Sequence, residues 1–250
     1  MMPDFFNPNE HADIIIPMYG SLHMLTLVIL LAFIPLLILL REPLKGLCAS
    51  QKTLNRIMVG YLAFDLFYWV MIWHFQYMPL YERFPFHLCA SLSLLLPVSV
   101  LLKRYDIIRF FTPWGLAAGF IAFVNPGYVR DLPWSFAFIH YLVRHYFIFI
   151  LPLALYIGKG YSLNYRLFRR SMTALALYAS FIFCVNWATG SNYFHLGKYN
   201  PLAIPFLPDS LTAWPLVLPT FITVGVVLIH VIYLIIALSE KRFRKTGEHS

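Results

Sequence analysis

Charged residues are scarce in this sequence. They make up only 12% of its 250 residues, whereas hydrophobic residues make up 60% and the mean hydropathy is +0.69. A soluble domain of this composition would expose apolar patches far larger than a monomer tolerates. The composition therefore excludes a soluble globular protein and predicts a multi-pass protein of the cell membrane.

Cysteine is also sparse, and several kinds of segment are missing. The sequence has three cysteines, an odd number too small for a disulfide framework. We find no internal repeat, no low-complexity segment and no soluble linker. The first sixteen residues are polar and acidic, so we expect no cleavable signal peptide. We expect residues 1–250 to form a single domain.

Apolar runs of about 20 residues, long enough to cross a hydrocarbon core about 30 Å thick, recur along nearly the whole chain. The sequence therefore predicts an all-α fold, a bundle of seven transmembrane helices. We place the spans at 18–40, 57–78, 87–102, 108–124, 136–157, 171–188 and 214–238.

The fourth span contains the segment "GLAAG", which places Gly115 and Gly119 four residues apart. Small residues at this spacing let the backbone of another helix approach closely. We expect this face to serve helix packing.

Lysine and arginine are distributed unevenly between the predicted loops. The even-numbered loops hold one each, Arg83, Arg130 and Lys198. The odd-numbered loops and the carboxyl-terminal tail are basic, with Arg41, Lys45, Lys52, Arg56, Lys103, Arg104, Arg109, Lys159, Arg166, Arg169, Arg170, Lys241, Arg242, Arg244 and Lys245. Basic loops stay in the cytoplasm, so we predict an external amino terminus and a cytoplasmic carboxyl terminus. Because the basic residues are spread over separate loops, they do not predict nucleic-acid binding.

Polar side chains within the predicted spans gather toward the outer side of the bilayer. They are His23, His74, His87, Cys89, His140, Arg144, His145, Cys184 and Asn186, and Asn192, Tyr193 and His195 follow in the next external loop. The inner half has far fewer, chiefly Asp65 and His230. Ionisable groups at membrane depth are costly and mark functional sites, so this sorting predicts an outward-facing site.

Asp65 is the only acidic residue within a span, and Arg144 is the only basic one away from the span ends, since Arg109 lies at the edge of the fourth span. An unpaired charge in the membrane is costly, so we predict that the two form a buried salt bridge. Binding of a phosphate or carboxylate group by Arg144 is the competing use.

No zinc-binding histidine pair is visible. His140 and His145 are five residues apart, about 140° around a helix, whereas zinc-binding pairs prefer a separation of four. A metal site built from His23, His87 and His145 on three helices stays open, but nothing specific in the sequence supports it. We expect no metal and no cofactor.

Cys89 is the candidate nucleophile. It lies in the first turn of a predicted helix, where the helix dipole stabilises an anion, and a histidine from another helix could act as its base. The alternative is a cysteine that only fills space in an apolar helix.

Four segments resemble the YwaF-type integral membrane proteins, bacterial relatives of a vertebrate transmembrane protein family. They are "GSLHMLTL", "FPFHLCASLSLLL", "HYLVRHYFIFILPLALY" and "CVNWATGSNYFHL", and the resemblance covers nearly the whole chain. The vertebrate relatives are described as cysteine-dependent acyltransferases that move a fatty acyl chain from a phospholipid to a lysophospholipid.

This resemblance implies that membrane phospholipids and lysophospholipids are the partners of the protein. It also implies that Cys89 accepts the acyl chain and that a histidine, His145 or His87, is its base. Five further residues of the four segments are the expected substrate-binding groups: His23, Arg144, Asn186, Asn192 and Tyr193. Asn186, Asn192 or a backbone N–H would stabilise the oxyanion.

Two other functions stay open. One is a metal-dependent lipid hydrolase, in which intramembrane histidines hold a metal ion that activates water. The other is a small transporter or binding protein that uses Asp65 and Arg144 as an internal polar pair. The sequence names neither the substrate nor the oligomeric state.

Overall fold

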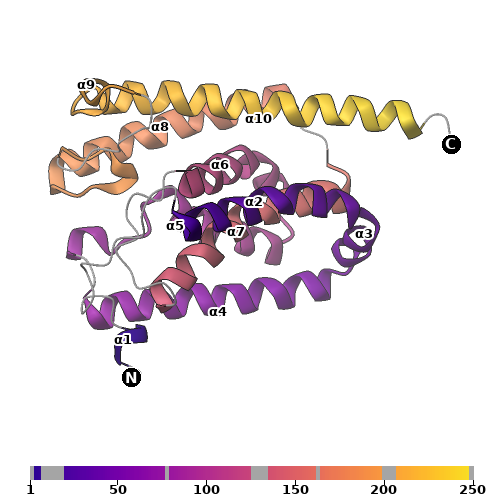
Figure 1. Cartoon of the computed structure of the whole chain (residues 1–250), viewed down its shortest axis with the longest axis horizontal. Helices are drawn as coiled ribbons and strands as arrows, with labels where there is room; N and C mark the ends of the chain where they lie inside the picture. Colours follow the sequence, from indigo (N-terminus) through magenta and orange to yellow (C-terminus); the bar gives the residue numbers. More distant parts are fainter. Residues whose placement is uncertain are drawn as a thin grey trace.

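The structure is a computed structural model that describes residues 3–6, 20–76, 79–124, 135–161, 164–198 and 207–247. All regular elements in these ranges are helical (Figure 1). The α-helices are α1 (Pro3–Phe6), α2 (Ser21–Leu39), α3 (Arg41–Ala49), α4 (Gln51–Phe75), α5 (Leu88–Leu101), α6 (Tyr105–Val124), α7 (Phe136–Lys159), α8 (Tyr165–Thr189), α9 (Asp209–Thr212) and α10 (Val217–Gly247). Two short 3₁₀ helices, η2 (Leu80–Glu82) and η3 (Tyr193–His195), lie in the connections.

The all-α prediction is confirmed, and the protein is a multi-pass membrane protein. Five described helices are long and apolar enough to cross a membrane: α2, α4, α6, α7 and α8. The other two predicted spans coincide with shorter apolar helices, α5 and the Val217–Val231 part of α10. Residues 18, 19, 77 and 78 of the predicted spans, and Arg130 of the charge pattern, lie outside the described residues. The orientation in the membrane stays a prediction.

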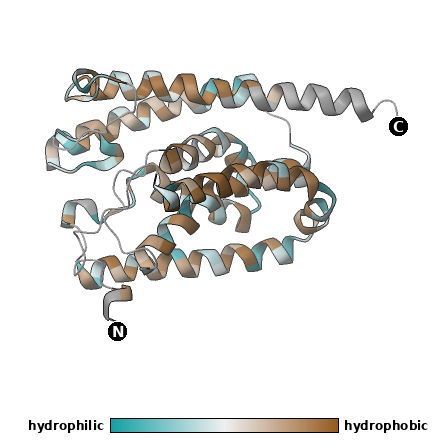
Figure 2. Cartoon of the chain, in the orientation of Figure 1, coloured by the Kyte–Doolittle hydropathy of each residue, from teal (hydrophilic) through white to brown (hydrophobic). Residues whose placement is uncertain are grey.

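The distribution of polar and apolar side chains on α2 suits a lipid environment. The helix is apolar along nearly its whole length (Figure 2). Leu25, Val28 and Leu39 are exposed, whereas the polar side chains of His23 and Thr26 are buried. Helices in lipid turn polar groups toward their neighbours because hydrocarbon offers those groups no hydrogen bonds.

Helices α6 and α7 pack closely through two glycines of α6. A Cβ atom at Gly115 would lie 2.6 Å from the carbonyl oxygen of Ile148, and one at Gly119 would lie 2.7 Å from the Cβ of Phe149. Neither position has room for a methyl group. The expectation that "GLAAG" is a packing face is therefore confirmed.

The first predicted loop is largely helical, which corrects the sequence-based description of residues 41–56. Helix α3 fills most of it, and α4 begins at Gln51, where the Ser50 side chain accepts a hydrogen bond from the backbone N–H of Thr53. Cys48 is not a loop residue: it is 1% exposed and packs against α7 at Gly158. Burial raises the pKa of its thiol.

The remaining helices are arranged around α5, α6 and α7 (Figure 1). Helices α8 and α10 run side by side and contact each other and α6. Helix α4 lies on the opposite side of the bundle, where it contacts α5 and α7. This arrangement brings the polar residues of α4, α5 and α7 together.

Candidate active site

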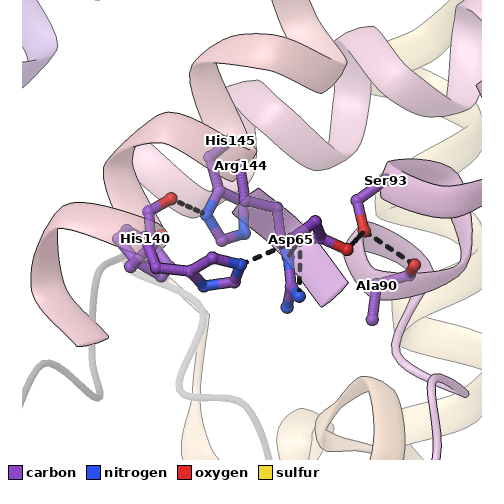
Figure 3. Close-up of polar contacts among 7 residues, drawn as sticks. Asp65, Ala90, Ser93, His140, Arg144 and His145 are labelled. Atoms are coloured by element: carbon purple, nitrogen blue, oxygen red, sulfur yellow. Dashed lines mark hydrogen bonds and ion pairs between the residues drawn. The ribbon is translucent and has the colours of Figure 1, made fainter. Parts of the chain in front are cut away.

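Asp65, in the middle of α4, is the centre of a buried polar cluster (Figure 3). Its Oδ1 accepts hydrogen bonds from Nε2 of His140 at 2.8 Å and from Nε and Nη2 of Arg144 at 3.0 and 2.9 Å. Its Oδ2 accepts one from the hydroxyl group of Ser93 at 3.0 Å. The carboxylate is fully buried, and it joins α4 to both α5 and α7.

The predicted salt bridge between Asp65 and Arg144 is confirmed. The guanidinium group also lies over the rings of Tyr68 and Trp69, with its central carbon 5.4 Å from each ring centroid. A cation over aromatic faces is stabilised by their electron density. Asp65 uses the Nε–H and one N–H of Nη2, so a phosphate or carboxylate ligand would find only the two N–H groups of Nη1 and the second N–H of Nη2.

His140 is a third member of this cluster that the sequence analysis did not assign to it. His140 and Arg144 are four residues apart in α7 and therefore lie on one face of the helix, which was the available signal. The sequence analysis places Asp65 toward the inner side and His140 toward the outer side, whereas the structure brings the two into contact. Asp65 bonds to His140, which lies in the second turn of α7.

The hydrogen bond of His145 defines which of its ring nitrogens is available. Nδ1 lies 2.7 Å from the carbonyl oxygen of Tyr141. A carbonyl oxygen can only accept, so Nδ1 carries the proton, and the lone pair of the neutral ring is on Nε2. His145 is 6% exposed.

His87 has the opposite arrangement. It precedes the first residue of α5, and its Nδ1 accepts a hydrogen bond from the backbone N–H of Phe194 at 3.3 Å. The lone pair of His87 is therefore occupied by the loop that follows α8. The His87 ring also contacts the rings of Tyr193 and His195, at centroid distances of 5.2 and 5.9 Å.

Asn186 and Tyr193 build the loop that covers His87. Oδ1 of Asn186 accepts hydrogen bonds from Ser191 Oγ and Tyr193 N, and its Nδ2 donates to the carbonyl oxygen of Tyr193 at 2.7 Å. The Tyr193 hydroxyl accepts a hydrogen bond from the backbone N–H of Phe84. These two candidate site residues therefore hold the loop against the segment that leads into α5.

Asn192 contributes to the same loop. Its Oδ1 accepts a hydrogen bond from the backbone N–H of Gly197 at 2.9 Å. Phe194 and His195 both have left-handed backbone conformations, with φ of 58° and 56°. Residues other than glycine rarely adopt this conformation and are held there by surrounding contacts. Burial lowers the pKa of His195, which keeps this ring neutral at pH 7.

Cys89 lies in the first turn of α5, directly after His87 and Leu88. It is a free, partly buried thiol that packs against the main apolar core. Within the described residues its sulfur makes no hydrogen bond to His87 or His145. Cys184, by contrast, is exposed on α8.

His23 lies beside the cluster rather than within it. Its Nε2 donates a hydrogen bond to the carbonyl oxygen of Phe123 at 2.6 Å, which joins α2 to the end of α6. The Phe123 ring in turn contacts the His145 ring, at a centroid distance of 6.3 Å. His23 is thus connected to His145 through one intervening aromatic residue.

The structure adds two polar groups that the sequence analysis did not single out. The Tyr61 hydroxyl and the Trp69 indole N–H are buried without a hydrogen-bond partner among the described residues. Tyr61 is 8% exposed, and its ring stacks on that of Phe147. Tyr61 and Trp69 each lie four residues from Asp65, so both share the face of α4 that carries this carboxylate. That spacing was the signal in the sequence.

Among the described residues, no three histidine, cysteine or acidic side chains lie close enough together to hold a metal ion. His23, His87 and His145 are each engaged with a different backbone group. The metal site left open by the sequence is therefore not assembled in this part of the chain.

The fold and this buried cluster define an integral membrane protein whose polar site lies between α4, α5 and α7. Residues 18–233 match the model of the TMEM164 family. The chain belongs to the TMEM164 family. Comparisons with curated proteins and with solved structures find no match.

Proposed function

We propose that this protein transfers fatty acyl chains between phospholipids and lysophospholipids, with Cys89 as the acyl acceptor and His145 as the base. The resemblance to YwaF-type proteins and their vertebrate relatives implies this chemistry, and membership of the TMEM164 family is consistent with it. The observation that carries the proposal is the hydrogen bond from Nδ1 of His145 to Tyr141, which leaves Nε2 as a proton acceptor.

The choice between the two histidines follows from their hydrogen bonds. In His87 the lone pair of the neutral ring accepts the N–H of Phe194, whereas in His145 it makes no hydrogen bond to a described residue. A general base needs a free lone pair within reach of the proton that it removes. We therefore assign His145 as the base and His87 as the anchor of the loop beside Cys89.

In the proposed cycle, Nε2 of His145 takes the proton of the Cys89 thiol. The thiolate attacks the ester carbonyl of a phospholipid, and the tetrahedral intermediate collapses to a thioester. The departing lysophospholipid oxygen takes the proton back from His145. A second lysophospholipid then donates its hydroxyl proton to His145 and attacks the thioester. Cys89 leaves as a thiolate and takes the proton back from His145.

The oxyanion of this intermediate needs hydrogen-bond donors that the resting protein does not already use. Asn186 is a poor candidate, because both polar atoms of its amide group bond to the loop after α8. Asn192 is part of that loop, where its Oδ1 accepts from Gly197. The Tyr61 hydroxyl and the Trp69 N–H fit better, since both are buried and unpartnered among the described residues. We propose that one of these two groups, which lie about 12 Å apart along α4, is the donor in place of the asparagines.

The test is transfer from a phospholipid whose acyl chain carries an alkyne, with purified protein in lipid nanodiscs. A hydroxylamine-sensitive label on Cys89 and transfer of the chain to added lysophospholipid are the expected results. Cys89→Ala should abolish both, and Cys184→Ala, which changes an exposed cysteine, should preserve both. Undiminished transfer by Cys89→Ala would refute the thioester route.

The proposed site faces the outer leaflet only if the amino terminus is external. We propose this orientation from the basic residues of the odd-numbered loops. A reporter fused after Ser250 should then be active only on the cytoplasmic side, and activity on the other side would reverse the assignment.

A further inference from the structure

A second polar cluster lies near the far end of α7 from the Asp65 cluster. Nζ of Lys159, the last residue of α7, donates a hydrogen bond to the carbonyl oxygen of Cys48 at 2.9 Å. The same ammonium group lies over the ring of Tyr105, 4.4 Å from its centroid. Lys159 is about 22 Å along α7 from Arg144, so the two clusters are separate sites.

Aromatic rings connect Lys159 to another cation. The ring centroids of Tyr105 and Tyr161 are 6.0 Å apart, and the guanidinium carbon of Arg109 lies 5.7 Å from the centroid of Tyr161. The Tyr105 hydroxyl donates a hydrogen bond to Oε1 of Gln51 at 2.6 Å, which joins the group to α4. These five residues, here named the Lys159 cluster, are held together by contacts between separate helices.

The Lys159 cluster carries two positive charges and no carboxylate. The ion pairs in the described part of the chain involve Glu42, Asp65 and Asp106, and none of them includes Lys159. Of the three N–H groups of the Lys159 ammonium, one bonds to Cys48. Like charges that are partly buried repel each other, and a bound anion would offset that repulsion. The cluster therefore suits an anionic ligand.

The surface beside the Lys159 cluster suits a lipid. Helix α7 is one of the candidate membrane spans, and Lys159 ends it, so the cluster lies where a span leaves the hydrocarbon and lipid phosphate groups begin. Helix α3 packs against α7 and the end of α2 at this end of the bundle (Figure 1). Leu39, Leu40 and Leu47 are exposed there. Apolar side chains next to an anion site match a ligand with acyl chains.

We infer that the Lys159 cluster binds an anionic phospholipid, whose phosphate group contacts Lys159 and Arg109 and whose acyl chains pack beside Leu47. The predicted orientation makes this a lipid of the inner leaflet. The site is separate from Cys89, and the inference does not use acyl transfer, so it can hold or fail independently of the proposed function.

The experiment is native mass spectrometry of delipidated protein in detergent, titrated with phosphatidylglycerol or with zwitterionic phosphatidylcholine. Phosphatidylglycerol should bind at least fivefold more tightly. Lys159→Gln should raise its Kd about fivefold, because one cation near a headgroup contributes about this much. Lys159→Arg, which keeps the charge, should stay within about twofold of wild type.

Lys52→Gln is the matched control. It removes the same charge at the same end of the bundle, from an exposed position in the first turn of α4 that lies outside the Lys159 cluster. Its Kd for phosphatidylglycerol should stay within about twofold of wild type. Equal weakening by Lys52→Gln and Lys159→Gln would mean diffuse attraction to the basic loops and would overturn the inference, as would equal affinity for the two lipids.

Inorganic phosphate in place of the lipid distinguishes the two sources of a phosphate group. It should raise the Tm of the detergent-solubilised protein less than phosphatidylglycerol at the same concentration, because it has no acyl chains to pack beside Leu47. An equal or larger rise that Lys159→Gln removes would assign the Lys159 cluster to free phosphate and overturn the lipid site.

Cys48 reports whether Lys159→Gln loosens α3. This thiol is 1% exposed, so iodoacetamide should label it only when α3 moves away from α7. If Cys48 stays unlabelled, Lys159→Gln decides. If Cys48 becomes reactive, Arg109→Gln takes its place, and an unchanged Kd for phosphatidylglycerol in that variant overturns the inference.

Discussion

The backbone N–H of Phe194 donates a hydrogen bond to Nδ1 of His87, although the two residues are 107 positions apart in the chain. The bond joins the loop after α8 to the start of α5, two residues before Cys89. His87 accepts this bond only while its Nδ1 is unprotonated.

His87→Asn tests whether His87 is an anchor or a base. Asparagine places an acceptor oxygen near the position of Nδ1 but cannot serve as a general base near pH 7. As an anchor, His87→Asn should keep acylation of Cys89 within about threefold of wild type, whereas His87→Ala should reduce it strongly, because the Phe194 N–H loses its partner. Equal loss of acylation in both variants would identify His87 as the base.

Neutralising one member of the Asp65–Arg144 pair with an apolar residue should strongly destabilise the protein. Arg144→Met or Asp65→Leu leaves the partner as a buried unpaired charge, at a cost of about 3–5 kcal/mol. The double variant should recover part of this loss, and thermal melting of all four proteins measures the coupling. Strictly additive losses would mean that the pair contributes no coupling energy.

Gly115→Ala should destabilise the contact between α6 and α7. The new methyl group would lie 2.6 Å from the carbonyl oxygen of Ile148, and a backbone atom cannot move aside without shifting its helix. We expect a loss of about 1–3 kcal/mol, measured as a lower Tm. Gly60→Ala is the control, since nothing lies within 4 Å of its Cβ position and its Tm should not fall.

Tyr61→Phe should slow formation of the Cys89 thioester without destabilising the fold. The phenylalanine ring can keep the stacking on Phe147, while the buried hydroxyl that lacks a partner is removed, so the Tm should stay unchanged or rise. Loss of one oxyanion donor typically slows such a step by about 10²–10³-fold.

Tyr156→Phe is the matched control for this change. Its hydroxyl is also buried without a partner among the described residues, but it lies about 18 Å along α7 from Arg144. Acylation of Cys89 should therefore be unaffected in Tyr156→Phe. If Trp69→Phe slows acylation and Tyr61→Phe does not, the oxyanion donor is the indole N–H.

Patterns within single helices predicted much of this fold. Each predicted apolar span coincides with a helix. The two glycines of "GLAAG" predicted the close approach of α6 to another helix. The pairing of Asp65 with Arg144 followed from the cost of an unpaired charge in the membrane, with no knowledge of the structure.

Features that depend on how separate segments meet were not predictable in this way. That His140 shares Asp65 with Arg144 depends on the register of α4 against α7. The contact of Phe194 with His87 depends on a loop whose left-handed residues have no sequence signal such as glycine. Helix α3 was missed because a short helix with several charged residues looks like a loop in a hydropathy pattern.

The contact of α3 with α7 has a mechanical consequence. Cys48 fills the space beside Gly158, and Lys159 donates a hydrogen bond to the Cys48 carbonyl oxygen at 2.9 Å. Helix α3, which joins α2 to α4, is thereby held against the carboxyl-terminal end of α7. The Asp65 cluster joins α4 to the first turns of α7 as well, so the α3–α4 segment is held toward both ends of α7 and should move with it as one unit.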